Sequence, residues 1–116
     1  MYAVRGRTIV ASHPFAARVH VEPDGEEVLF PNGARLRADM RDYVGAPEIL
    51  VALTSENGGL TVIDENTFEI QLTGEQTARM TQSYVVVDLI RTDVSPPIYS
   101  YVELRIPVKQ PVTRGI

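Results

Sequence analysis

The sequence predicts an all-β fold, an antiparallel β-sandwich with one short helical turn near residues 74–80. Clusters of glycine, proline, asparagine and aspartate recur at short intervals, and these residues favour tight turns. The segments between the clusters are short and several alternate apolar with polar residues, as half-buried strands do. Only one segment carries the signals of a helix start. The turn clusters lie at residues 23–25, 31–33, 45–47, 57–59, 64–66 and 95–97.

Length and composition indicate one folded domain. The 116 residues are 44% hydrophobic and 22% charged, close to globular averages, and a chain of this size buries ~65% of its unfolded surface. The chain has no cysteine, so we expect neither disulfides nor thiolate-bound metals. Its apolar runs are far shorter than the roughly 18 residues that a membrane span needs. No membrane partner is therefore expected.

The charge pattern gives no sign of nucleic-acid binding. The net charge is −4, with six basic and eight acidic residues through Gly58 and five and seven after it. A nucleic-acid-binding domain usually shows a basic excess or a basic face. The densest basic stretch, residues 35–41, is interrupted by Asp39.

The N-terminal segment, residues 1–14, is expected to be either an arm or an extra edge strand, with a short strand at residues 8–11. An arm can add as a strand to the open sheet edge of a neighbouring subunit. Residues 15–110 then form the β-sandwich domain, and residues 111–116 form a C-terminal tail.

Two segments in the first half read as strands. In residues 34–41 the apolar positions alternate with arginine and aspartate, which places all the charge on one face. Residues 49–53 are apolar throughout. A strand of that kind is either central in the sandwich or covered by a neighbouring molecule.

A hairpin and the helical turn follow. Residues 60–63 and 67–72 should pair across residues 64–66, with Asn66 as the candidate for the left-handed backbone position. Thr73 with Gln76 three residues later fits a capping box. Such a turn carries the chain from one sheet of a sandwich to the other.

The last two strands differ in pattern. Residues 101–109 alternate cleanly apart from Pro107, which cannot donate to a β-ladder and therefore predicts a sheet edge or a bulge at that position. Residues 84–90 have one apolar and one mixed face. The apolar face holds Val85, Val87 and Leu89, and the mixed face holds Tyr84, Val86, Asp88 and Ile90.

No catalytic or metal-binding constellation stands out. His13 and His20 are the only histidines, and a spacing of seven fits neither a helical nor a strand metal pair. No serine lies in a glycine-flanked elbow, no glycine pattern fits a phosphate loop, and no spacing selects a carboxylate pair. We therefore expect no enzyme activity, no metal, no cofactor and no small-molecule substrate.

Tyrosine and aspartate near the C-terminus are the candidate interface residues. Tyr99 and Tyr101 lie two residues apart on one strand face, and tyrosine suits both protein interfaces and sugar-binding platforms. Tyr84 either joins them or anchors a loop corner at the start of its strand. Asp88 is either an interface acceptor for arginine or a backbone amide, or an exposed strand aspartate.

Residues 72–114 resemble a known family. The stretch reads LTGEQTARM, then YVVVDLIRTD, then paired prolines, then IYSYVELRIPVKQPVTR. This order is similar to the immunoglobulin-like sandwich at the N-terminus of tailed-bacteriophage baseplate upper proteins and in related single-domain virion proteins, and the resemblance covers roughly residues 28–114. It implies an immunoglobulin-like fold and adds Arg114, in the terminal Val-Thr-Arg motif, to the interface candidates.

The resemblance further implies a structural protein of a virion, assembled in the cytoplasm of a bacterial host. Such a protein docks to other virion proteins and to copies of itself, through strand edges, the tyrosine face, the N-terminal arm and the tail. The chain ends at Ile116 without the long downstream segment of baseplate upper proteins, so tail, baseplate, connector and head-decoration positions all stay open. The alternative function is a carbohydrate- or ligand-binding β-sandwich module.

Overall fold

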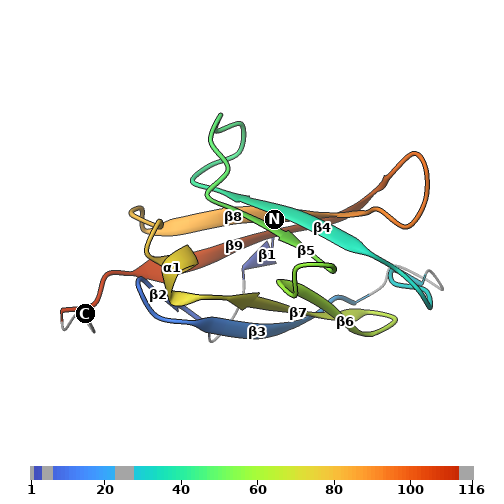
Figure 1. The fold of residues 1–116 in the computed structure, drawn as a ribbon, viewed down its shortest axis with the longest axis horizontal. Helices are drawn as coiled ribbons and strands as arrows, with labels where there is room; N and C mark the ends of the chain where they lie inside the picture. Colours follow the sequence, from blue (N-terminus) through green and yellow to red (C-terminus); the bar gives the residue numbers. More distant parts are fainter. Residues whose placement is uncertain (1, 4–6, 23–27, 113–116) are drawn as a thin grey trace.

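A computed structural model describes residues 2–3, 7–22 and 28–112. Figure 1 shows strands in two layers joined by one short helix. The elements are β1 Tyr2–Ala3, β2 Ile9–Val10, β3 Phe15–His20, β4 Leu36–Arg41, β5 Val51–Thr54, β6 Leu60–Asp64, β7 Thr67–Leu72, α1 Gly74–Thr77, β8 Tyr84–Arg91 and β9 Ile98–Lys109.

The two layers are a larger and a smaller sheet. The larger sheet has the order β1-β9-β8-β4-β5, with β2 also paired to β9, and the smaller sheet has the order β3-β7-β6. All pairs are antiparallel except those of β1 and β2 with β9. The order β9-β8-β4 facing β3-β7-β6 is that of strands G-F-C facing B-E-D in immunoglobulin-like sandwiches. The predicted all-β sandwich is confirmed.

The core lies between the sheets and follows the predicted alternation. In β4 the side chains of Leu36, Ala38 and Met40 are buried, while Arg37 is exposed. The apolar face predicted for β8 and the apolar positions of β9 are likewise buried. Each outward-pointing residue of β4, β8 and β9 therefore stands on the outer surface of the larger sheet. In β5 the alternation begins only at Val51, because Leu50 before it is also buried.

The predicted capping box is present, but the helix is shorter than residues 74–80. The Thr73 hydroxyl accepts from the Gln76 amide, and the Gln76 side chain accepts from the Thr73 amide. After Thr77 the backbone bonds tighten, with the amide of Met80 donating to Thr77. The fully buried side chain of Met80 enters the core there, and the chain crosses from β7 in the smaller sheet to β8 in the larger.

The turn between β6 and β7 differs from the prediction. Asn66 does not take the left-handed conformation, because Ser12 and Tyr101 are the only non-glycine residues of the described ranges with positive φ. Instead the Asp64 carboxylate accepts a hydrogen bond of 2.9 Å from the Asn66 amide. This side-chain bond closes the turn and makes a left-handed residue unnecessary.

Of the two alternatives predicted at Pro107, a sheet edge or a bulge, the bulge is not found there. The register shift between β8 and β9 lies between Tyr99 and Glu103, away from Pro107. On its other side β9 is paired to β1 at Leu104 and to β2 at Val108. Pro107 falls between these two short pairings, while the next amide, of Val108, donates to the Ser83 carbonyl on the β8 side. The missing N–H therefore points away from β8, at a position where β9 has no partner strand among the described residues, in agreement with the edge alternative.

Candidate functional site

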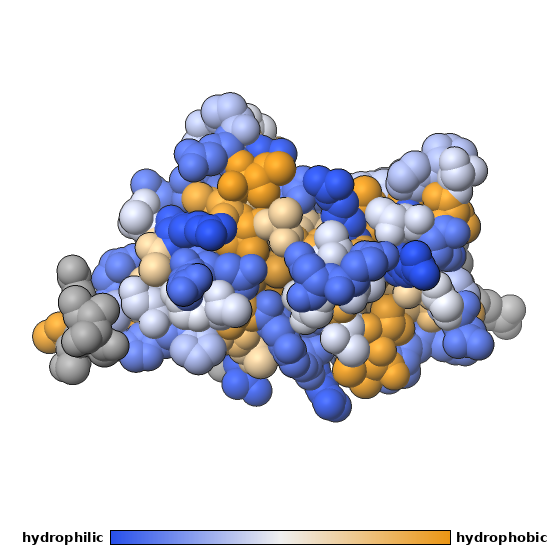
Figure 2. All heavy atoms as spheres, in the orientation of Figure 1, coloured by the Kyte–Doolittle hydropathy of each residue, from blue (hydrophilic) through white to orange (hydrophobic). Residues whose placement is uncertain are grey.

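The outer face of the larger sheet lies between two projections. One is the loop of residues 42–50 between β4 and β5, and the other is the tip of the β8–β9 hairpin, residues 92–97. Both rise on the side of the larger sheet that faces away from the smaller one (Figure 1). The outline of the molecule dips between them (Figure 2). We call the surface between the projections the trough.

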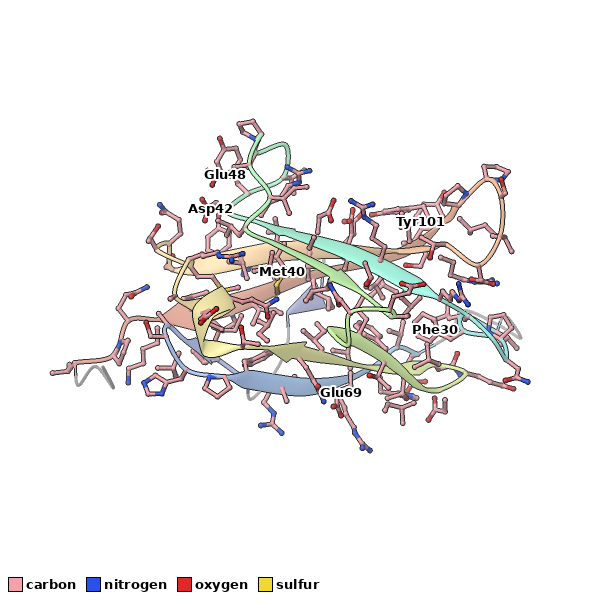
Figure 3. All side chains as sticks on the ribbon, viewed as in Figure 1. Phe30, Met40, Asp42, Glu48, Glu69 and Tyr101 are labelled. Atoms are coloured by element: carbon pink, nitrogen blue, oxygen red, sulfur yellow. The ribbon has the colours of Figure 1, made fainter. Side chains whose placement is uncertain are left out.

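Arg41, at the end of β4, holds the first projection in place. The Arg41 guanidinium donates a hydrogen bond of 2.6 Å to the Ala46 carbonyl, and its other nitrogen lies 4.0 Å from the Asp39 carboxylate. Ala46 is buried in the base of the loop, and Gly45 beside it has φ of 86°, which glycine adopts without strain. The hydrogen bond from Arg41 thus anchors the loop. Asp42 lies at its base and Glu48 lies farther out (Figure 3).

Three carboxylates lie in a row across the floor of the trough. Arg37 pairs with Ile90 and Met40 with Val87, so Asp39 of β4 lies beside Asp88 of β8. Asp88 in turn pairs directly with Glu103 of β9. Like charges directly opposite one another destabilise a sheet. No ion pair to Asp88 or Glu103 is present among the described residues.

The neighbouring row is basic at both ends. Arg41, Val86 and Arg105 follow one another across β4, β8 and β9. Arg105 lies over the ring of Tyr84 at 5.4 Å from its centroid, a cation–π contact. Arg37 and Arg41 lie 3.6 and 4.0 Å from the Asp39 carboxylate. None of these arginines forms an ion pair with Asp88 or Glu103 among the described residues.

Two tyrosines stand at the hairpin side of the trough. The Tyr99 hydroxyl donates a hydrogen bond of 2.7 Å to Glu103, and its ring meets that of Tyr101 edge to face at 4.9 Å between centroids. Burial raises the pKa of Tyr99 well above its usual value, and the carboxylates of Glu103 and Asp88 raise it further. Tyr99 is thus a neutral donor over the whole ordinary pH range.

Tyr101 (labelled in Figure 3) has an unusual backbone for a large side chain. Its φ is 60°, in the left-handed region, and its side chain is 79% exposed. The strain arises at the bulge that shifts the β8–β9 register, where the Ser100 hydroxyl bonds the Leu89 carbonyl at 2.8 Å. Backbone strain of this kind is typical of functional positions.

The floor contains a groove of about 250 Å³, in which Val44, Val86 and Arg41 lie beside the three carboxylates. One oxygen of Asp39 is buried without a hydrogen-bond partner, and the Arg37 guanidinium lies 3.6 Å from it. Apolar exposure is concentrated around this groove. Five of the nine large hydrophobic residues that are exposed in the described ranges lie on this face or in its two projections: Tyr43, Val44, Ile49, Tyr84 and Tyr101.

Four of the five predicted interface residues lie on this face: Tyr84, Asp88, Tyr99 and Tyr101. Tyr99 and Tyr101 are in contact, and Tyr84 lies toward the other end of β8, beside Arg105. Asp88 is exposed, and the Tyr84 ring lies under the Arg105 guanidinium. Arg114 lies outside the described residues. Sequence reasoning missed Asp39, Glu103 and the projecting loop as parts of one site. The alternation in residues 34–41 pointed Asp39 outward, but only the strand order places it beside Asp88.

Other chemistry finds little support in the described part of the chain. No group of three histidine, cysteine, aspartate or glutamate side chains there is arranged to hold a metal ion. His20 contacts Thr67 at 2.9 Å and Glu22 at 3.3 Å on the far side of the sandwich. The helix that the structure describes is too short to cross a membrane. No protein-family model matches this chain, and no curated protein matches it.

Proposed function

We propose that this protein is a structural component of a tailed-bacteriophage particle, in the tail, baseplate, connector or head, and that it works by docking and not by catalysis. One observation carries the docking part: exposed apolar residues gather on one face around Asp88 and Glu103, which have no basic partner among the described residues. Exposed apolar patches of this kind mark interaction surfaces. The phage part is supported by the resemblance of residues 72–114 to phage sandwich domains.

The proposed partners are other virion proteins and copies of this chain, met during assembly in the bacterial cytoplasm. For other virion proteins the first contact surface is the trough, with Asp88, Tyr99 and Tyr101, and Tyr84 lies on the same sheet face beside Arg105. Open strand edges are a second means of contact, because β5 and β6 end their sheets. At the opposite end of the larger sheet β1 and β2 pair with the chain's own β9.

A carbohydrate-binding module is the alternative, favoured by the exposure of Tyr101. Sugar rings stack best on a flat aromatic platform, whereas the rings of Tyr99 and Tyr101 stand at 81° to each other. A glycan array tests this alternative. Specific binding by a monomer would favour it over the docking function.

The docking function is tested by looking for the protein in assembled particles. Particles purified from the host that carries the gene are analysed by mass spectrometry, and an antibody against the chain locates it by electron microscopy. We expect a fixed number of copies at one position in the particle. A protein that is absent from particles and stays monomeric in light scattering would contradict the proposal.

A further inference from the structure

We propose that the trough binds a slender basic segment of a partner protein, with an arginine or lysine side chain over Asp88 and Glu103 and apolar neighbours against Val44 and Tyr101. The inference rests on the proposed docking function and names the chemistry of the partner. It follows from the shape of the trough, its apolar walls and the charge of its floor.

The shape excludes a broad, flat partner. Two sheets that pack face to face approach to ~10 Å, and the two projections of this face stand in the way of such an approach (Figures 1 and 2). A second copy of this chain presents the same projections and cannot stack its larger sheet here. An extended or helical segment that crosses the strands between the projections meets no such obstacle.

The walls supply apolar contact. Val44 of the loop is 75% exposed, and Tyr101 of the hairpin is 79% exposed. Val86 lies in the floor between them. Val44 and Tyr101 lose water-exposed apolar surface when a partner covers them, which contributes ~25 cal/mol per Å² of that surface. The left-handed backbone of Tyr101 fits this role, since it holds a bulky side chain out from the surface at a cost in stability.

The floor selects a cation. Asp88 and Glu103 face each other directly. In the neighbouring row, Arg41 contacts the Ala46 carbonyl and Asp39, and Arg105 lies over the Tyr84 ring. A positive side chain placed over the pair removes their repulsion and gains charge-assisted hydrogen bonds. A guanidinium suits two carboxylates best, because its planar fork presents several donors at once.

The test is a nuclear magnetic resonance titration of the intact protein with an acetylated, amidated pentapeptide, Ala-Val-Arg-Val-Ala. Its matched control replaces arginine by citrulline, which is neutral and nearly the same shape. We expect the arginine peptide at millimolar concentration to shift the amides of residues 86–90 and 101–105, and the citrulline peptide to leave them unchanged. High salt should weaken the binding.

Two isosteric variants locate the binding. Asp88→Asn and Glu103→Gln should each weaken the peptide about fivefold or more, since each removes one charged acceptor. Glu65→Gln, in the exposed turn between β6 and β7, is the control and should bind as the wild type does. The amide spectrum of each variant verifies its fold.

Three results would overturn the inference: no shift with the arginine peptide, equal binding of the citrulline peptide, or unchanged binding by both trough variants. Shifts of the same amides on raising the protein concentration alone would also overturn it, because a second copy would then occupy the trough. None of these results bears on whether the protein is found in particles. A failure here is therefore distinguishable from a failure of the proposed function.

Discussion

The outer faces of the two sheets arise from the same alternation of inward and outward side chains, but their charged residues are paired differently. On the smaller sheet Arg18 of β3 lies 3.1 Å from Glu69 of β7, to which the Gln71 side chain also donates a hydrogen bond of 2.6 Å. The pKa of Glu69 is lowered by these two partners. On the larger sheet Asp88 and Glu103 face each other without a basic partner among the described residues.

Apolar exposure follows the same division. Ile63 is the one large hydrophobic residue of the smaller sheet's strands that is more than a third exposed in the described ranges, at 39%, whereas the outer face of the larger sheet and its projections hold five. The smaller sheet's face (Glu69 in Figure 3) satisfies its own charges. Departures from such local consistency are expected where a protein binds something. The outer face of the larger sheet is thus the one that leaves carboxylates without a basic partner and apolar side chains exposed.

The largest predicted loss of stability comes from removing a buried side chain on the inner side of the smaller sheet. Phe68 of β7 is fully buried and packs edge to face on Phe30 at 5.7 Å between centroids. Phe68→Ala should lower the free energy of unfolding by ~3–5 kcal/mol, measured by urea denaturation. Gln71→Ala, on the outer side of the same strand, is the control and should cost below ~1 kcal/mol. Similar losses for both would mean that the inner face does not dominate stability.

The base of the hairpin projection should weaken in acid. Arg91 donates two hydrogen bonds to Asp93, and this holds the pKa of Asp93 at about 2, below its ordinary value of 3.8. Because the folded pKa is depressed, the stabilisation is complete above pH ~4 and is lost as the pH falls toward 2.

We therefore expect Asp93→Asn to lower the melting temperature at pH 7 and to reduce the loss of stability between pH 4 and pH 2. Melting curves of wild type and variant across that range measure both effects. Parallel curves, with the same pH dependence for the two proteins, would show that the pair with Arg91 contributes nothing.

Replacing Tyr101 by glycine should raise stability but weaken docking. Its left-handed backbone costs roughly 1 kcal/mol for a residue other than glycine, and its exposed ring returns little. Tyr101→Gly should raise the free energy of unfolding by about that amount while weakening docking at the trough. Tyr101→Phe keeps the strain and should leave stability unchanged. A loss of stability in the glycine variant would mean that the contact with Tyr99 outweighs the strain.

The sequence predicted the local features of the fold better than the site. Alternation in residues 34–41 and 101–109 is a property of single strands, so it identified the buried side chains correctly, and Thr73 with Gln76 located the helix start. The row from Asp39 to Glu103 needs the order of three strands, which local patterns do not contain.

The backbone conformations at the turn and the bulge were not predicted correctly, for a related reason. Asn66 carries a strong left-handed preference, but the Asp64 side chain closes that turn by another route. Tyrosine carries no such preference, so nothing in the sequence signalled the positive φ of Tyr101. The strands on either side impose it through the shifted register of β8 and β9.

The most direct test applies one chemical change to both faces. Asp88→Asn removes an unpaired charge from the larger sheet, and Glu69→Gln removes a paired charge from the smaller one. Urea unfolding at neutral pH measures both variants against the wild type. We predict that Asp88→Asn raises the free energy of unfolding by ~0.5 kcal/mol, whereas Glu69→Gln lowers it. A loss of stability in Asp88→Asn like that in Glu69→Gln would contradict the account, because the Asp88 carboxylate would then be stabilised by its surroundings as the Glu69 carboxylate is.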